Sequence, residues 1–382
     1  MSNSNVVRIA IIGIGNMGKK YSKKIEDGKV QRMVLTAVCE TSESGKNWAR
    51  ENLNEDVKIF ADSDELFLHS ELFDAVLITT PHKLHPQQAI QAFEHNKHVF
   101  CEKPAGVSLI DAKKMQAAAE MAGKKYAMMY HNRTYPVIKK LKELLQENTI
   151  GTINRMILEN SNYYRTNFYH ESADWRSSWS GEGGGVLINQ GQHILNYWEW
   201  LFGRPQTIFA NIPFGKYNEF EVDDEATIVM EYPNKVTGLL ILTTGEIQRD
   251  ERLCIVGSMG KISMYGNRIV IEKNHMDSME YGRTAQIISR NNMSTTSETI
   301  ICDAPEEAYD KMLNNFSEAI LDEIDLISTG EDGCKTLEIS NAAYMSAWLN
   351  QKITLPIDEM TYEKLLNEHI EQENLIGMSN LL

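Results

Sequence analysis

The sequence predicts an α/β protein in which a doubly wound parallel sheet is followed by a second α/β domain with a large, mainly antiparallel sheet. Three observations support this fold class. A short apolar run, a glycine-rich loop and a helix pattern open the chain in that order. Strand and helix patterns then alternate up to about residue 130, as they do in parallel sheets. Later strand patterns are joined by short turns that contain Pro, Asn or Gly.

The composition is that of an ordinary globular protein and excludes several function classes. The 382 residues are enough for two domains with cores of their own, and 42% of them are hydrophobic and 24% charged. No run reaches the roughly 18 consecutive apolar residues of a membrane span. The net charge of −15 argues against a nucleic-acid partner, because phosphate binding needs a dense basic surface. We therefore expect a small-molecule substrate and no membrane partner.

The cysteines and the N-terminal residues indicate the compartment. The five cysteines are scattered without a CxxC motif or a matching histidine spacing, so we expect neither a disulfide framework nor a zinc site. The stretch MSNSNVVRIAIIG has no basic segment and no small-residue cleavage site. We interpret its apolar residues as a first strand rather than a signal peptide. These features predict a cytoplasmic protein without a bound metal.

The first motif is a glycine-rich loop between a strand pattern and a helix pattern. The strand Val7–Ile12 leads into GIGNMG, and the helical KKYSKKIEDG follows. In a dinucleotide-binding Rossmann unit, Gly13 would permit the tight turn, Gly15 would let the backbone approach the pyrophosphate, and Gly18 would let helix and strand pack closely. The pyrophosphate would bind the free N–H groups at the helix start. The candidate cofactor-binding residues of this loop are Gly13, Gly15, Asn16, Met17 and Gly18.

A carboxylate at the end of the second predicted strand favours NAD over NADP. The strand 34–39 is followed by Glu40, about 20 residues beyond the last glycine, where an acid accepts hydrogen bonds from the adenosine ribose. No arginine is adjacent to Glu40, and its negative charge would repel the 2′-phosphate of NADP. The alternative is a surface acid at the end of a strand.

The alternation of strands and helices continues beyond this acid. Strand patterns at 74–79, 98–101 and 126–130 are separated by helix patterns at 86–94 and 109–122. Ligands of doubly wound sheets bind at the carboxyl ends of the strands, so the residues that directly follow each strand are candidates. These residues are Thr80, Pro81 and His82, then Glu102, Lys103 and Pro104, and finally His131, Asn132 and Arg133.

The two histidines in PHKLHP could in principle be metal ligands. Pro81 and Pro86 flank His82 and His85, no third ligand is evident, and hydride transfer to NAD needs no ion. We therefore expect His82 to line the cofactor site, with His85 at the start of the following helix.

A later glycine-rich stretch leads into a helix pattern that carries polar residues among apolar ones. Residues 182–200 read EGGGVLINQGQHILNYWEW. On a helix, Asn189 and His193 are four residues apart and project from one face. We expect the glycines to let the chain pass close to a ligand, and the helix to direct this pair toward the nicotinamide. The alternative is that His193 is a buried histidine satisfied by a neighbour.

Aromatic residues and arginines alternate in the segment before these glycines. NYYRTNFYHESADWRSSWSGEGGG has the serine and glycine content of a loop. Aromatic faces against sugar C–H edges, with arginines that donate to hydroxyls, are typical of a carbohydrate pocket. The alternative is that the aromatic residues anchor the loop to the core. The substrate-binding candidates here are Tyr163, Arg165, Tyr169, Trp175 and Arg176.

The second half of the chain has the pattern of a mixed α/β domain. Its strand patterns are joined by Pro, Asn and Gly turns, and its two late helical stretches could pack back on the first domain. The segment 283–303 is the least patterned. The strands are expected at 226–232, 236–244, 252–256, 261–264 and 268–273, and the helices at 306–327 and 333–348.

Three stretches resemble one known family in the order in which that family has them. They are GIGNMG, TTPHKLHPQQAIQAFEHNKHVFCEKP and GEGGGVLINQGQHILNYWEWLFG. Together they closely resemble the glucose-fructose oxidoreductase, inositol dehydrogenase and rhizopine-catabolism (Gfo/Idh/MocA) family of nicotinamide-dependent sugar and polyol dehydrogenases. The resemblance extends over most of residues 6–355. It implies a Rossmann domain and a second domain whose large sheet often supports dimers or tetramers.

The resemblance also implies which residues carry the chemistry. The family's Glu-Lys-Pro lysine maps onto Lys103, and its acid-x-x-x-histidine pair maps onto Asn189 and His193. Many members have aspartate where this chain has Asn189, which weakens a charged relay. Asn132, Arg133, Lys103 and His193 join the substrate-binding candidates. We expect an NAD-binding domain at 1–130, a substrate-binding and oligomerisation domain at 131–355, and a C-terminal tail at 356–382.

These features predict an NAD-dependent dehydrogenase that oxidises a secondary hydroxyl of a sugar, polyol or glycoside. His193 would act as the acid/base and Lys103 as its electrostatic partner. One alternative is a glycosidase that uses NAD for oxidation, elimination and reduction. Another is a non-catalytic sensor of NAD and sugar on the same fold. Retention of Lys103 and His193 speaks against the sensor, because a sensor needs no base.

Overall fold

The structure is a computed structural model and describes residues 5–288 and 293–379. The chain divides into two compact units. The first contains the residues up to Thr134, the short segment Gly181–Gly183 and the segment Glu307–Glu338. The second contains Tyr135–Ser180, Gly184–Glu306 and the residues from Ile339 onward.

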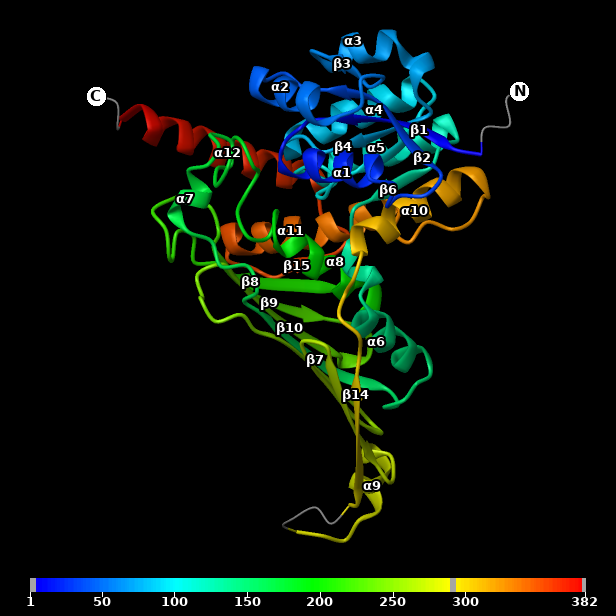
Figure 1. The fold of residues 1–382 in the computed structure, drawn as a ribbon. Helices are drawn as coiled ribbons and strands as arrows, with labels where there is room; N and C mark the ends of the chain where they lie inside the picture. The colour runs from blue at the N-terminus through cyan, green and yellow to red at the C-terminus, as the bar shows by residue number, and fades with distance from the viewer. Residues whose placement is uncertain (1–4, 289–292, 380–382) are drawn as a thin grey trace. The chain divides into compact units, whose positions relative to one another are not determined.

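The first unit is built on a six-stranded parallel sheet in the order β3-β2-β1-β4-β5-β6 (Figure 1). Its strands are short and almost continuously apolar, which is typical of parallel strands that are covered on both faces. The order reverses between β1 and β4, the position where ligands of such sheets bind. The strands are β1 (Val7–Ile12), β2 (Met33–Cys39), β3 (Lys58–Phe60), β4 (Ala75–Ile78), β5 (His98–Cys101) and β6 (Tyr126–Met128).

Helices follow the strands of this unit, and one helix from late in the chain completes its core. In α10 (Ala308–Leu321), Met312, Leu313 and Phe316 are buried in the same cluster as residues of β1 and β2. The Phe316 ring lies 5.1 Å from that of Phe100 in β5. The other helices are α1 (Asn16–Glu26), α2 (Glu43–Asn52), α3 (Ser63–Leu68), α4 (His85–Glu94) and α5 (Leu109–Ala122), with short 3₁₀ turns at 70–72, 82–84 and 131–134.

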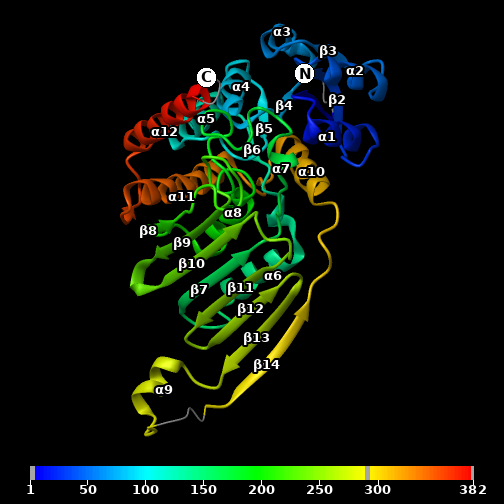
Figure 2. The ribbon, with the colours of Figure 1, turned by 90° about the vertical axis from the view of Figure 1, so that its left-hand side faces the viewer.

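The second unit is built on a nine-stranded sheet in the order β14-β13-β12-β11-β7-β10-β9-β8-β15 (Figure 2). All neighbours are antiparallel except β7 and β10, which run parallel. The strands are β7 (Ile153–Asn160), β8 (Thr207–Asn211), β9 (Glu225–Glu231), β10 (Thr237–Thr243), β11 (Glu251–Gly257), β12 (Gly260–Tyr265), β13 (Arg268–Asn274), β14 (Thr295–Ile301) and β15 (Ile353–Thr354).

Helix α8 packs on this sheet through its aromatic residues. Gly238 of β10 leaves room for the Trp198 ring, since a Cβ atom there would lie 2.7 Å from it. Trp198 Nε1 also donates to the Tyr232 hydroxyl at 2.8 Å. The helices of this unit are α6 (Pro136–Gln146), α7 (Asn167–His170), α8 (Gly191–Phe202), α9 (Ser278–Thr284) and α12 (Glu359–Ser379), with a short 3₁₀ turn at 233–235, while α11 (Gly330–Leu349) is shared between the two units.

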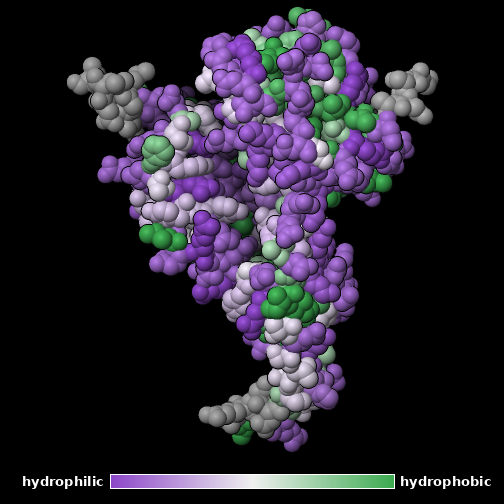
Figure 3. All heavy atoms as spheres, in the orientation of Figure 1, coloured by the Kyte–Doolittle hydropathy of each residue, from purple (hydrophilic) through white to green (hydrophobic). Residues whose placement is uncertain are grey.

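The predicted fold class is confirmed: a parallel doubly wound sheet and a second, mostly antiparallel sheet are both present. Two local predictions were wrong in their bounds. The late helix expected at 306–327 ends at Leu321, and the strand expected at 126–130 ends at Met128. The segment without a pattern contains β14, which pairs with β13 as an exposed edge strand. Figure 3 shows a hydrophobic patch at one end of β14. Ile301, the last residue of this strand, is 65% exposed.

Candidate functional site

The glycine loop of the first unit has the backbone geometry that a dinucleotide requires. Gly13 has φ +94°, a conformation that favours glycine. A Cβ atom on Gly18 would lie 2.0 Å from the Gly13 carbonyl oxygen, so only glycine lets α1 pack this closely. At Gly15 nothing lies within 4 Å of a Cβ position, which leaves this backbone open to a ligand. The loop therefore fits a pyrophosphate.

The start of α1 is available to an anion. Its N-cap is Gly15, which has no side chain to accept from the first turn, and that turn carries no acidic residue. The helix begins with Asn16 and Met17, the predicted cofactor-binding residues. Free N–H groups at a helix start bind phosphate oxygens well, because the helix dipole is positive there.

Glu40 lies against this glycine loop. Its carboxylate accepts hydrogen bonds from the backbone N–H of Ile14 at 2.7 Å and of Ser42 at 2.8 Å. Each carboxylate oxygen can accept a further bond, so the ribose hydroxyls of a bound NAD would find acceptors here. The nearby basic residues of α2, Lys46 and Arg50, contact Glu43 instead.

The residues after β4 connect the glycine loop with the next loop of the sheet. Thr80 packs against Gly13, where a Cβ atom would lie 2.9 Å from its Cγ2. His82 is buried, and its Nδ1 lies 3.2 Å from the Glu182 carbonyl oxygen. His85 is fully buried, with Nδ1 2.8 Å from the Pro104 carbonyl oxygen and Nε2 2.8 Å from that of Thr80. His85 thus joins the loops after β4 and β5 through Pro104.

Among the described residues, no group of three or more His, Cys, Asp or Glu side chains is arranged to hold a metal ion.

A buried carboxylate fixes the loop that carries Lys103. Glu102 accepts hydrogen bonds from the hydroxyl of Tyr21 in α1 and from the backbone N–H of Lys103, the latter at 3.2 Å. Burial raises the pKa of Glu102, while the charge of Lys103 and the bond from Tyr21 act in the opposite direction. The pair Glu102 and Tyr21 therefore couples the helix of the glycine loop to the Glu-Lys-Pro loop.

The three residues after β6 have different surroundings. His131 is buried beside the Tyr309 ring, 4.4 Å away. Burial, with the charges of Lys103 and Lys20, lowers the pKa of His131 to about 3. Asn132 is buried as well, and its Oδ1 has no hydrogen-bond partner among the described residues. This orphaned acceptor supports the predicted role of Asn132 in ligand binding.

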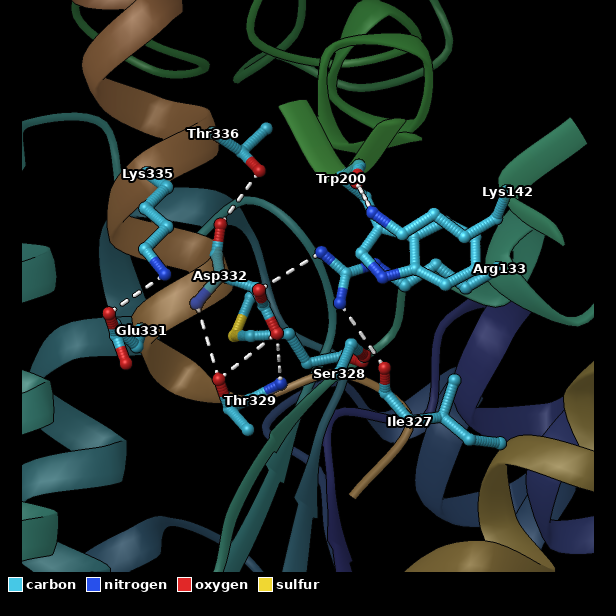
Figure 4. Close-up of polar contacts among 11 residues, drawn as sticks. Arg133, Lys142, Trp200, Ile327, Ser328, Thr329, Glu331, Asp332, Lys335 and Thr336 are labelled. Carbon is cyan, nitrogen blue, oxygen red and sulfur yellow. Dashed lines mark hydrogen bonds and ion pairs between the residues drawn. The ribbon is translucent and has the colours of Figure 1, made fainter. Parts of the chain in front are cut away.

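Arg133 makes contacts that favour a structural role. Its side chain is 4% exposed, and its guanidinium forms an ion pair with Asp332 at 3.0 Å. Nη1 donates to the Ile327 carbonyl oxygen at 3.2 Å, as Figure 4 shows. Both partners belong to the first unit, so Arg133 holds the first turn of α11 and the segment before it. Its role in substrate binding stays a prediction.

In the second unit, His193 is the third residue of α8 and is half-buried, as the helix pattern predicts. The prediction that Asn189 lies on the same helix was wrong, because α8 begins only at Gly191 and Asn189 lies in the turn before it. Asn189 is nevertheless oriented by a neighbour, since its Nδ2 donates to the Tyr169 hydroxyl at 3.1 Å.

The path into α8 is fixed by a buried carboxylate that the sequence pattern does not reveal. Asp223, 1% exposed, accepts hydrogen bonds from the N–H of Gly185 at 2.7 Å and of Leu187 at 2.8 Å. It also accepts one from the Tyr344 hydroxyl at 2.6 Å. Burial raises the pKa of Asp223, and these three bonds oppose the rise. We call Asp223, with Gly185, Leu187 and Tyr344, the Asp223 clamp.

Two of the glycines before α8 are required by this clamp. A Cβ atom on Gly184 would lie 2.2 Å from the Tyr344 hydroxyl oxygen, and one on Gly185 would lie 1.8 Å from the Asp223 carbonyl oxygen. These glycines therefore let the chain approach its own buried groups. That this segment also approaches a ligand stays a prediction. Gln192 also has a structural contact, since its Nε2 donates to the Leu187 carbonyl oxygen at 2.9 Å.

The aromatic and arginine residues before α8 gather around Tyr169. Its hydroxyl accepts from Arg176 Nη1 at 2.8 Å and from Gln190 Nε2 at 3.3 Å, in addition to Asn189. The guanidinium carbons of Arg165 and Arg176 each lie 4.5 Å from the centre of the Tyr169 ring. Arg165 also lies 5.9 Å from the Tyr163 ring, and Arg176 4.5 Å from the Trp175 ring. The five predicted substrate-binding residues of this segment thus form one cluster.

Two parts of the chain match models of one family. Residues 7–131 match the oxidoreductase family with an NAD-binding Rossmann fold, and residues 138–263 match the GFO/IDH/MocA C-terminal domain. The chain belongs to the GFO/IDH/MocA family. It is an oxidoreductase with an NAD-binding Rossmann domain, as the sequence predicts.

Relatives in this family include two proteins of Bacillus subtilis. The chain is 23% identical to the uncharacterized oxidoreductase YrbE over 362 residues, which cover 90% of this chain and 95% of YrbE. It is 29% identical to IolU, named scyllo-inositol 2-dehydrogenase (NADP(+)), over 59% of this chain and 67% of IolU. The name of IolU gives NADP(+) as its cofactor, whereas the name of YrbE gives none.

Solved structures of two dehydrogenases share the fold. The WlbA dehydrogenase from Bordetella pertussis, in complex with NADH and UDP-GlcNAcA, has a TM-score of 0.79 and 22% identity, covering 93% of this chain and 99% of its own. Levoglucosan dehydrogenase, in complex with NADH and levoglucosan, has a TM-score of 0.76 and 18% identity, covering 92% of this chain and 99% of its own.

None of the helices in the described residues is both long and apolar enough to cross a membrane.

The contacts of Glu40 predict the cofactor preference. Replacing Glu40 with alanine removes the acceptors for the ribose hydroxyls and the charge that repels a 2′-phosphate. The affinity ratio of NAD to NADP should fall by about 10-fold or more, because hydrogen bonds to charged groups contribute about 1.5 to 3 kcal/mol. Titration of both cofactors measures the ratio, with Glu55→Ala as an exposed control. Tighter binding of NADP by the unmodified protein would contradict this assignment.

The Asp223 clamp predicts a loss of stability on an isosteric change. In Asp223→Asn, the amide NH₂ group must face at least one of the N–H donors of Gly185 and Leu187. The free energy of unfolding should fall by about 1 to 3 kcal/mol, the cost of leaving buried donors unsatisfied. Denaturant unfolding measures this change. The control is Asp250→Asn, which removes a surface ion pair with Arg252. Equal stability of both variants would exclude the clamp as a stabilising contact.

Proposed function

We propose that the protein oxidises a secondary hydroxyl of a sugar, polyol or glycoside reversibly, with NAD as the hydride acceptor. The observation that carries this proposal is Lys103, which stands directly after β5 at the carboxyl end of a parallel sheet in an NAD-binding oxidoreductase. Ligands of doubly wound sheets bind at this edge. The relatives named as inositol and levoglucosan dehydrogenases support a polyol or sugar substrate.

His193 is the proposed acid/base. Oxidation of a secondary alcohol releases one proton from the hydroxyl and one hydride from the carbon, and leaves a ketone. When bound, NAD⁺ accepts the hydride. A free hydroxyl is too weak an acid to lose its proton unaided at neutral pH, so a base in hydrogen-bond reach is required. Histidine suits this role, because a neutral imidazole accepts the proton and returns it in the reverse reaction.

Lys103 is the proposed electrostatic partner. An ammonium group stabilises negative charge that develops on the substrate oxygen, and it polarises the ketone in the reverse direction. The backbone of Lys103 is held by Glu102, which is held in turn by Tyr21. These contacts fix the backbone position from which the Lys103 side chain extends.

Asn189 is proposed as a positioning residue. Its amide donates to Tyr169 and lies two residues before α8, so it connects the aromatic cluster with the helix that carries His193. An amide can orient a neighbouring group, but it cannot stabilise a charged imidazole as the aspartate of many relatives would.

We also propose a cytoplasmic homodimer or homotetramer. The support for assembly is the family resemblance and the partly exposed face of the nine-stranded sheet, on which Phe209 and Val229 are 39% and 40% exposed.

Lys103→Ala and His193→Ala should each keep the fold and NAD binding while turnover falls by about 10² to 10⁴, the contribution of a general acid–base group. The assay follows NADH absorbance with a panel of polyols, sugars and glycosides. Lys273→Ala and His275→Ala, exposed residues of the second unit, are the controls. NADH should accumulate in solution with at least one substrate.

Three results would contradict the proposal. If the activity losses are no larger than those of the controls, another residue acts as the acid/base. Glycoside cleavage without accumulation of NADH would indicate a redox-assisted glycosidase. Binding of NAD and sugar without any turnover would indicate a sensor.

A further inference from the structure

The cluster around Tyr169 concentrates positive charge in a chain whose net charge is −15. Arg165 and Arg176 both stack on the Tyr169 ring, and Arg176 Nη1 also donates to its hydroxyl. Stacking on an aromatic face holds a guanidinium in one plane and leaves its N–H edge available for an acceptor in that plane. The Tyr169 ring thus contacts one face of each guanidinium.

The donors of Arg165 are only partly used by the protein. Its Nη1 donates to the Tyr164 carbonyl oxygen at 3.2 Å. Its Nε is buried and has no hydrogen-bond acceptor among residues 5–288 and 293–379. Within the same residues, Arg165 forms no ion pair with a carboxylate. A buried donor on a charged group is costly unless an acceptor satisfies it, so this atom points to a ligand.

A second buried nitrogen without a partner lies in the same cluster. His170 contacts the Ser177 hydroxyl through Nδ1 and packs against the Tyr169 ring at 5.3 Å. Its Nε2 is buried, again without a partner in the part of the chain that the structure describes. Burial lowers the pKa of His170, Asp224 raises it, and Arg165 and Arg176 lower it further. His170 therefore adds a hydrogen-bonding group to the cluster and no negative charge.

The one carboxylate that acts on His170 is committed elsewhere. Asp224 is fully buried and accepts hydrogen bonds from the backbone N–H groups of Lys216 at 3.1 Å, Tyr217 at 2.7 Å and Asn218 at 3.1 Å. These bonds hold the loop between β8 and β9. Asp224 thus serves this loop, and among the described residues it forms no ion pair with Arg165.

We propose that Arg165, Arg176 and His170 bind an anionic substituent of the substrate, a carboxylate or a phosphate on the sugar. This inference rests on the proposed function, because it assigns the substrate class of the same enzyme. Neutral hydroxyls are recognised equally well by uncharged amides, whereas a guanidinium matches the paired oxygens of a carboxylate or phosphate. In a strongly acidic protein, a local positive cluster also selects an anion that the remaining surface repels.

The test compares matched sugars that differ only in charge. Glucose is paired with glucuronate and with glucose 6-phosphate, and galactose is paired with galacturonate. Binding to the NADH-loaded protein is measured by calorimetry, and kcat/KM with NAD is measured in parallel. At least one acidic sugar should bind about 10- to 100-fold more tightly than its neutral partner, the range expected for charge-assisted hydrogen bonds. The uronates and the phosphate distinguish the two kinds of anion.

Variants assign the preference to Arg165. Arg165→Gln should weaken binding of the acidic sugar by about 10-fold more than binding of its neutral partner. Arg165→Lys should retain part of the preference, because it keeps the charge and loses the planar fork. Arg268→Gln, which removes an exposed charge from β13 of the same unit, should leave the preference unchanged.

The outcomes separate this inference from the proposed function. No preference for any acidic sugar, or equal losses for acidic and neutral sugars in Arg165→Gln, overturns the anion site, even if a neutral sugar is oxidised. Binding of an acidic sugar that depends on Arg165, without oxidation of any sugar, supports the anion site and contradicts the proposed dehydrogenase.

Discussion

The conformation of the candidate substrate-binding part of the second unit depends on the buried carboxylate of Asp223. It accepts two backbone N–H groups of the segment before α8 and the hydroxyl of Tyr344, which comes from α11. A buried carboxylate is costly unless its oxygens are satisfied, and these three donors satisfy it. The chain between Gly184 and α8 is therefore restricted to one path. That path determines where α8 begins and hence where His193 emerges.

The first unit uses the same principle at its nucleotide site. Glu40 accepts two backbone N–H groups at the rim of the glycine loop, and Glu102 joins Tyr21 of α1 to the backbone of Lys103. In each case a carboxylate fixes a loop at the end of a strand, where regular backbone pairing stops. The strands supply a rigid edge, and the carboxylates determine the conformation of the loops that extend from it. Preorganised loops of this kind suit both cofactor binding and charge stabilisation.

The sequence predicts the two sheets well, because the apolar runs of the strands and the turn residues between them are local features of the chain. Continuous apolar runs identify the buried parallel strands, and the expected strands 34–39 and 74–79 agree within one residue with β2 and β4. The edge strand β14 is not recognisable from the sequence, since most of its side chains are exposed and its residues show no apolar pattern. The helix that carries His193 is predicted correctly, whereas Asn189 falls in the turn that precedes it.

The side-chain contacts of the site are harder to predict. Asp223 stands in VDDEA and has the pattern of a surface acid, yet its partners lie 36, 38 and 121 residues away in the chain. The sequence also hides the protein groups that Gly184 and Gly185 approach, because Tyr344 and Asp223 are distant in the chain. From the sequence alone, these glycines therefore suggest only a ligand. The aromatic and arginine cluster is found from composition, since its members all lie in one short segment, from Tyr163 to Arg176. The unpartnered nitrogens of Arg165 and His170 are visible only in three dimensions.

The measurement that tests the proposed hydride transfer most directly follows the hydrogen itself. The protein and NAD⁺ are incubated with sugars, polyols and their acidic derivatives that carry deuterium on carbon, and the recovered nicotinamide cofactor is analysed by mass spectrometry. We expect NADH that carries one deuterium taken from the substrate carbon, together with the corresponding ketone. Recovery of unlabelled NAD⁺ from every member of the panel, with the protein folded and NAD bound, would contradict the proposed dehydrogenase.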